Sequence, residues 1–87
     1  MADLKKICRL RMHLKLVSFF HENQSTVDTA QAIAAWLNQS HKEIETSLDY
    51  LVNQKILNIH RTGSTVAYGY TQDKKTIDEI ENFIKKG

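Results

Sequence analysis

Residues 27–54 read VDTAQAIAAWLNQSHKEIETSLDYLVNQ, and this stretch decides the predicted fold. Its tetrapeptide SHKE at 40–43 has the pattern of a capping box. In that motif the Ser40 hydroxyl accepts a hydrogen bond from the Glu43 backbone N–H, and the Glu43 carboxylate reaches back to the Ser40 N–H. The pattern therefore predicts a helix over about residues 41–54.

A second capped helix is predicted just before it. Asp28 has the character of an N-cap, with Gln31 at the third helical position, and Val27 is placed to staple onto Ala32. This pattern predicts a helix over about residues 29–37. Two capped helices joined by a turn of about four residues are typical of a helix-turn-helix.

The composition is that of an ordinary globular chain. Its 87 residues are enough for one domain, with 41% hydrophobic and 25% charged residues. No apolar run is long enough to cross a membrane, and the first residues do not form an apolar signal core, so we expect a cytoplasmic protein. Cys8 is the single cysteine, which excludes an internal disulfide, and a buried inert thiol is favoured over a redox sensor.

The charge is unevenly distributed. The formal net charge is +2, yet residues 5–15 contain five basic residues and no acidic residue: Lys5, Lys6, Arg9, Arg11 and Lys15. A basic run of this kind can follow the phosphates of a nucleic acid, but on a helix it is more often a solvated face. The second interpretation is favoured.

Residues 4–21 are predicted to form one helix with two apolar stripes. Ile7, Leu10, Leu14 and Val17 form one stripe, while Cys8, Met12, Leu16 and Phe19 form the other. The alternative is a strand over residues 8–16, where apolar and polar residues also alternate. A helix that is apolar on two sides needs two packing partners.

The pattern changes after Gln54. Alternating apolar residues on both sides of Thr62-Gly63-Ser64 predict a β-hairpin over about residues 57–71. The sequence TIDE at 76–79 resembles a capping box, and a final helix is predicted over about residues 75–85. The order of elements predicts an α+β fold in a single domain spanning residues 1–87.

This order resembles the winged helix-turn-helix superfamily of DNA-binding proteins over residues 14–71. The resemblance rests on LKLVSFF at 14–20, the two capped helices, LDYLVNQKIL at 48–57 and the turn at Gly63. It implies three core helices, a two-stranded hairpin called the wing, and a C-terminal helix. The segment GSTVAYG at 63–69 is also similar to the small D protein associated with dissimilatory sulfite reductase, another small winged helix.

In winged helix proteins that bind double-stranded DNA, the second helix of the helix-turn-helix enters the major groove and the wing reaches toward the backbone or a minor groove. The resemblance therefore implies base-reading candidates on helix 41–54, namely Lys42, Glu45, Thr46 and Asp49. It implies phosphate-binding candidates with amide, hydroxyl or guanidinium groups, namely Thr29, Gln31, Gln39, Ser40, Arg61, Thr62, Ser64 and Thr65.

The charge of helix 41–54 leaves a second function open. Lys42 stands against three acidic residues on this helix, Glu43, Glu45 and Asp49, although phosphate neutralisation dominates most DNA affinity. The alternative is therefore a protein-interaction module in a larger complex that does not bind DNA.

The terminal helices suggest a homodimer. The spare stripe of the first predicted helix, together with Ile77, Ile80 and Ile84, provides apolar surface for a second copy. Such a dimer would present two half-sites about one helical turn of DNA apart.

The remaining chemistry-bearing residues predict no further site. The four histidines lack metal-ligand spacing, and no phosphate loop, nucleophile elbow or paired catalytic carboxylates are present, so we expect no metal, no cofactor and no enzymatic activity. Trp36 and Phe20 could be exposed anchors for a partner, but core packing is the default for both, as it is for Tyr68 and Tyr70.

Overall fold

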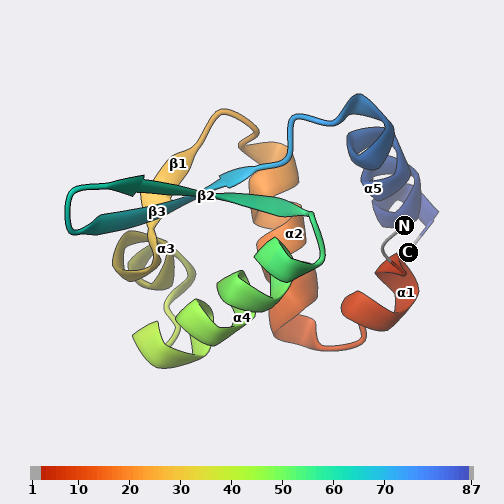
Figure 1. Ribbon diagram of the computed structural model, residues 1–87. Helices are drawn as coiled ribbons and strands as arrows, with labels where there is room; N and C mark the ends of the chain where they lie inside the picture. The colour runs from red at the N-terminus through yellow and green to blue at the C-terminus, as the bar shows by residue number, and fades with distance from the viewer. Residues whose placement is uncertain (1–2, 87) are drawn as a thin grey trace.

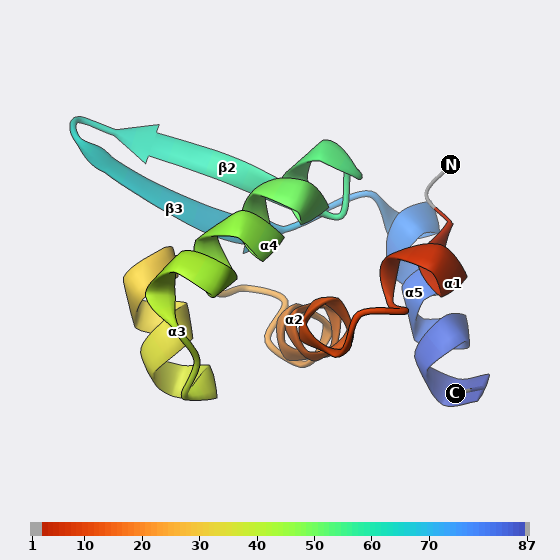
Figure 2. The same ribbon diagram turned by 90° about the horizontal axis from the view of Figure 1, so that it is seen from below.

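The computed structural model describes residues 3–86 and contains helices and one antiparallel sheet (Figure 1). In chain order the elements are α1 (Leu4–Ile7), α2 (Arg11–Glu22), β1 (Val27–Thr29), α3 (Ala30–Leu37), α4 (His41–Asn53), β2 (Leu57–Thr62), β3 (Thr65–Tyr70) and α5 (Lys74–Lys86). The sheet has the order β1-β3-β2. The tip of the β2–β3 hairpin lies at one end of the molecule, and α1 and α5 lie together at the other (Figures 1 and 2).

The core forms where α2, α3 and α4 meet one face of the sheet. The helices bury residues that are three or four positions apart, and β3 buries its last three residues, of which Tyr68 and Tyr70 point their side chains to the same face. The completely buried side chains include Leu16, Val17, Phe20, Ile33, Ile44, Leu48, Leu51, Ile56 and Ile80. The α+β fold class predicted from the sequence is confirmed.

Side chains of the preceding residues cap both helices of the helix-turn-helix. The Ser40 hydroxyl accepts from the Glu43 N–H at 3.4 Å, and α4 begins at His41, where the SHKE pattern places it. The Thr29 hydroxyl accepts from the Ala32 N–H at 3.2 Å, so Thr29, not Asp28, caps α3. Residues 27–29 form β1, and the extended backbone of this strand continues up to the cap.

The same two helices end in Schellman motifs, each closed by a residue other than glycine. Asn38 and Lys55 adopt left-handed φ angles of 54° and 68°. The Gln39 N–H donates to the Ala34 carbonyl at 2.9 Å, and the Ile56 N–H donates to the Leu51 carbonyl at 3.1 Å. The turn between the helices is therefore fixed by backbone hydrogen bonds.

The single helix predicted over residues 4–21 is wrong, and so is its alternative, a strand over residues 8–16. The helix is interrupted between α1 and α2, where the backbone of Leu10 is extended. The His13 ring is buried, its Nδ1 donates to the Ile7 carbonyl at 3.1 Å, and it stacks on Tyr50 with ring centroids 4.6 Å apart. The His13 ring thereby donates to the Ile7 carbonyl at the end of α1, a carbonyl that in a continuous helix would accept from the backbone N–H of Arg11.

Three further expectations need correction. β1 adds a third strand to the predicted two-stranded hairpin, with Val27 opposite Gly69 on β3. α5 is capped by Asp73, which accepts from the Thr76 N–H at 3.1 Å, and not by the 76–79 pattern. Trp36 is 57% exposed although core packing was the default, because it lies on the outer side of α3.

Two tyrosines on one face of β3 connect the sheet to three helices. The Tyr68 hydroxyl donates to the Asp49 carboxylate of α4 at 2.8 Å. The Tyr70 hydroxyl lies 3.0 Å from Nδ1 of His21 on α2, whose Nε2 is 3.8 Å from the Glu81 carboxylate of α5. Both phenols are buried as predicted, and each has a hydrogen-bond partner, which buried phenols need.

We expect Lys55→Gly to stabilise the protein by up to about 1 kcal/mol. A left-handed conformation costs a residue with a Cβ roughly that much, and glycine adopts it freely. Urea unfolding measures the change. The matched control is Gln54→Gly, since Gln54 has a φ of −86° and should lose about 0.5–1 kcal/mol. An equal loss in both variants would contradict the role of Lys55 in the Schellman motif.

The Tyr68 phenol should make the fold sensitive to alkaline pH. Burial and the adjacent Asp49 carboxylate raise the pKa of Tyr68 to about 12. Its protonated form therefore stabilises the fold fully below the unfolded pKa of about 10, and this contribution is lost as pH rises toward 12, amounting to about 1 kcal/mol at about pH 11.

Urea unfolding of Tyr68→Phe at about pH 7 and about pH 11 tests this contribution. The variant should unfold about 0.5–1.5 kcal/mol more easily near neutrality, because a hydrogen bond is lost, but its stability should fall less between the two pH values than that of the wild type. Asp49→Asn keeps Tyr68 buried but removes the neighbouring charge. Its loss of stability between the two pH values should therefore lie between that of the wild type and that of Tyr68→Phe. Parallel pH profiles for all three proteins would contradict the assignment.

Candidate nucleic-acid interface

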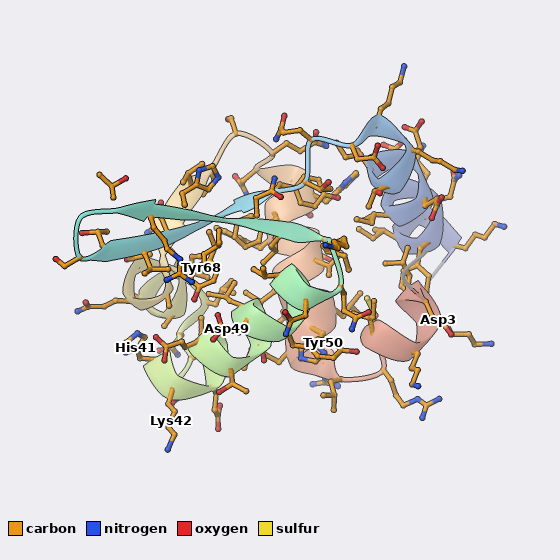
Figure 3. All side chains as sticks on the ribbon, in the orientation of Figure 1. Asp3, His41, Lys42, Asp49, Tyr50 and Tyr68 are labelled. Carbon is orange, nitrogen blue, oxygen red and sulfur yellow. The ribbon has the colours of Figure 1, made fainter. Side chains whose placement is uncertain are left out.

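The outer face of α4 is the first part of the candidate site. Four residues of α4 point into the core, namely Ile44, Ser47, Leu48 and Leu51. Because a helix turns by about 100° per residue, their burial fixes the opposite face toward solvent. The exposed residues on that side include all four base-reading candidates, Lys42, Glu45, Thr46 and Asp49. Lys42 projects outward from the first turn of α4 (Figure 3).

The tip of the β2–β3 hairpin is the second part. Thr62 pairs with Thr65 across a turn made by Gly63 and Ser64. Gly63 has a φ of +60°, a conformation that glycine adopts without strain. The candidates Arg61, Thr62, Ser64 and Thr65 are all exposed there. Both views place the hairpin tip and the N-terminal end of α4 at the same end of the molecule (Figures 1 and 2).

Three of the four base-reading candidates have partners within the protein. The Thr46 hydroxyl donates to the Lys42 carbonyl at 3.0 Å, Glu45 lies 4.0 Å from His41, and Asp49 accepts from Tyr68 at 2.8 Å. In Figure 3 Asp49 lies between α4 and Tyr68 of the hairpin. Within residues 3–86, Lys42 is the candidate whose side-chain ammonium makes neither a hydrogen bond nor an ion pair.

The phosphate-binding candidates near the starts of α3 and α4 differ in how many hydrogen bonds they already make within the protein. The hydroxyls of Thr29 and Ser40 accept the capping hydrogen bonds described above, so their remaining capacity is limited. Gln39 is half-buried and its N–H closes the turn, whereas Gln31 is exposed in the first turn of α3. Gln31 is therefore the most accessible amide of this group.

The electrostatics of α4 are mixed. Glu43, Glu45 and Asp49 outnumber Lys42, and Arg61 adds one positive charge from the hairpin. Burial and the neighbouring Asp49 raise the pKa of Tyr68 to about 12, so its phenol stays protonated and donates to Asp49 well above neutral pH. Asp49 is therefore held in a hydrogen bond that connects α4 to β3.

The basic run lies apart from this face. All five of its side chains, Lys5, Lys6, Arg9, Arg11 and Lys15, are exposed. α1 lies at the opposite end of the molecule from the hairpin tip (Figures 1 and 2). The interpretation as a solvated face agrees with this placement.

Two residues of the outer face were not among the candidates. His41 is the first residue of α4, and its exposed ring lies beside Glu45. Asn53 is exposed four residues after Asp49, at the C-terminal end of the same face. The helical spacing from the Ser40 cap was the signal that could have identified both.

Other kinds of site find little support in the described part of the chain. Residues 3–86 contain no group of three His, Cys, Asp or Glu side chains that could hold a metal ion. Burial raises the pKa of the Cys8 thiol, which disfavours the reactive thiolate. No helix among these residues has both the length and the apolar character needed to span a bilayer.

Comparison with known sequences gives no match: neither a protein-family model nor a curated protein matches the chain.

Solved structures do match. The chain is similar to HlyU from Vibrio cholerae, with a TM-score of 0.72 and 16% identity over 94% of this chain and 85% of that chain. It is also similar to AntR, an antimony-specific transcriptional repressor, with a TM-score of 0.70 and 16% identity over 95% of this chain and 75% of that chain. At this identity the likeness concerns the fold, and it confirms the resemblance seen in the sequence: the chain has the winged helix-turn-helix fold.

Proposed function

We propose that this protein is a small cytoplasmic DNA-binding transcriptional regulator and not an enzyme. The observation that supports this most is that the outer face of α4 and the hairpin tip lie at the same end of the molecule. A groove-reading helix and a backbone-contacting hairpin need this arrangement to reach one duplex together. AntR, which is similar in fold, is itself named a transcriptional repressor.

The dimensions of α4 suit the major groove. Its 13 residues span about 20 Å, and a helix about 10–12 Å in diameter enters a groove about 12 Å wide. In this pose Lys42 can contact guanine or a phosphate, Glu45 can accept from cytosine, and the Thr46 methyl can meet thymine. Gln31, Gln39 and Ser40 would lie toward the backbone near the turn, because they flank the starts of α3 and α4.

The hairpin would supply the remaining backbone contacts. Arg61 provides the charge, and the exposed hydroxyls of Thr62, Ser64 and Thr65 provide uncharged donors to phosphate oxygens. Asp49 has a positioning role in this proposal, since its hydrogen bond with Tyr68 holds α4 and the hairpin in one orientation.

We further propose a homodimer through the terminal helices. Ile77, Phe83 and Ile84 of α5 are only half-buried in the monomer and remain available to a second copy. Ile80, which the sequence suggested for this interface, is completely buried in the core of its own chain and cannot contact a second copy. α5 lies away from the hairpin tip (Figure 2), which leaves both copies of α4 free to contact DNA.

A second candidate function is protein binding through the outer face of α4 without DNA. The three carboxylates of α4 favour it, because they oppose a polyanion. The hydrogen bond from Tyr68 holds Asp49 in place but leaves its negative charge, so all three carboxylates count against DNA in this comparison.

Salt titration of DNA binding distinguishes these two functions. Fluorescence anisotropy with a mixed-sequence duplex should show affinity that falls as salt rises, and Lys42→Ala and Arg61→Ala should each reduce the slope of log K against log salt by about 1. Lys75→Ala is the matched control, because Lys75 is exposed on α5 outside the candidate site. Its slope should equal that of the wild type.

No duplex binding even at about 10 mM salt would reject the DNA-binding function and favour the protein-binding candidate. Equal loss of slope in Lys75→Ala and Lys42→Ala would instead place the contact elsewhere on the molecule.

Light scattering tests the dimer. The wild type should have twice the monomer mass at about 100 μM, and Ile84→Asp should be monomeric, because a buried unpaired charge costs several kcal/mol. Asn82→Asp is the matched control, since Asn82 is exposed on the same helix and should leave the dimer intact. A monomeric wild type would reject this interface.

A further inference from the structure

A groove lies between α2 and α3, on the side of α2 that faces away from α4. It has a volume of about 320 Å³ and an apolar floor formed by Leu14, Phe19 and Leu37. The core-facing residues of α2, such as Leu16 and Phe20, lie on the opposite side of this helix. In Figure 2 α2 is seen nearly end-on, with α4 and the hairpin above it, α3 to its left and α5 to its right.

The groove has the exposed apolar residues of a binding surface. Leu14, at the end of the first turn of α2, is 39% exposed. Trp36 of α3 is 57% exposed, and its ring centroid lies 5.7 Å from that of Phe19 on the groove floor. Exposed tryptophan beside an apolar hollow is a common feature of the energetically dominant part of a protein interface.

The charge around the groove indicates the occupant. Arg11 and Lys15 line one end of the groove, and Glu22 lines the other. The basic end continues into the run of residues 5–15, where no acidic side chain occurs. Within residues 3–86, no ion pair involves a basic residue of this run, namely Lys5, Lys6, Arg9, Arg11 or Lys15. Their charges are available to carboxylates of a partner.

We propose that this groove binds an acidic amphipathic helix of a partner protein. α2 is 12 residues long, which gives about three helical turns and about 18 Å of contact. A helix of that length places apolar residues at i, i+3, i+4 and i+7 on one face, where they would meet Leu14, Phe19 and Trp36. Carboxylates beside this face would pair with Arg11 and Lys15.

A second copy of this chain fits the groove less well. The amphipathic helix that a copy could offer is α5, which carries two lysines at each end, Lys74 and Lys75 at one and Lys85 and Lys86 at the other, and three carboxylates between them. Of these carboxylates, Glu81 already lies beside His21 and Lys85 of its own chain. In either direction one pair of lysines would approach Arg11 and Lys15, and like charges in contact disfavour the pairing. The proposal goes beyond DNA binding, and since the groove faces away from α4, both partners can bind at once.

Selection from a peptide library tests the proposal on the full chain. A display library of helix-forming 15-residue peptides is selected on the wild type, with counter-selection on Lys15→Glu. We expect enriched peptides to carry acidic residues beside apolar residues spaced i, i+3, i+4 and i+7. Their affinity should fall at least about tenfold on Leu14→Ser and on Lys15→Glu, and binding should shift the Trp36 indole N–H resonance.

Two variants serve as matched controls. Leu10→Ser removes a leucine that is 61% exposed but does not line the groove, and Lys75→Glu reverses a charge on α5. Both should bind the selected peptides as the wild type does.

Three results would overturn the proposal. One is that no peptide is enriched on the wild type over Lys15→Glu, and another is that the enriched peptides are basic or bind all variants equally. The third is that light scattering shows Trp36→Ser to convert a dimer into a monomer, which would mean that a second copy covers the groove, because Trp36 lies beside the groove and outside the dimer surface proposed on α5. Peptide binding without any DNA binding would reject the regulator proposal alone, so the two failures are distinguishable.

Discussion

The hydrogen bond from the Tyr68 hydroxyl to Asp49, at 2.8 Å, sets how α4 lies against the hairpin. A buried phenol needs a partner, and β3 supplies two such phenols on one face, Tyr68 toward α4 and Tyr70 toward His21 of α2. Directional contacts therefore connect β3 to α4 and α2, and through His21 to α5, in addition to apolar packing. In the sequence Asp49 resembles a base-reading residue because it is exposed on α4, but in the structure its carboxylate serves the fold. In the proposed DNA complex, α4 and the hairpin would therefore be oriented together by this contact.

Much of the fold could be predicted because its signals are local. The Ser40 cap, the hairpin around Gly63 and the apolar stripe of α5 each depend on residues a few positions apart. The errors arose where distant contacts decide the structure. β1 is only three residues long and becomes a strand because β3 lies beside it, and the break between α1 and α2 depends on the bond of His13 with the Ile7 carbonyl and on its stack with Tyr50. No periodicity in the sequence reports such contacts.

The sequence predicted where the candidate residues lie, but not which contacts their side chains make within the protein. The helical period placed Lys42, Glu45, Thr46 and Asp49 on one face, and the structure exposes all four. It could not show that Thr46 donates to its own helix, that Glu45 lies beside His41, or that Asp49 is held by a residue of the hairpin. Trp36 shows the same limit, because apolar character at helical spacing predicts burial, and only the arrangement of neighbouring helices leaves its ring at the surface.

The separation of charge along the chain constrains how this molecule can recognise partners. The acidic residues of α4 reduce the gain from phosphate neutralisation, which supplies most of the affinity of typical DNA-binding domains. One protomer would therefore bind DNA weakly, and useful affinity would depend on two linked copies, whose second contact is made at a high effective concentration. The basic run does not lie on the outer face of α4, so it would add little to a duplex bound there. Two of its residues, Arg11 and Lys15, line an apolar groove, where they are better suited to an acidic protein helix. The acidic charge of the proposed DNA-binding face and the location of these two residues therefore support the same division of the surface.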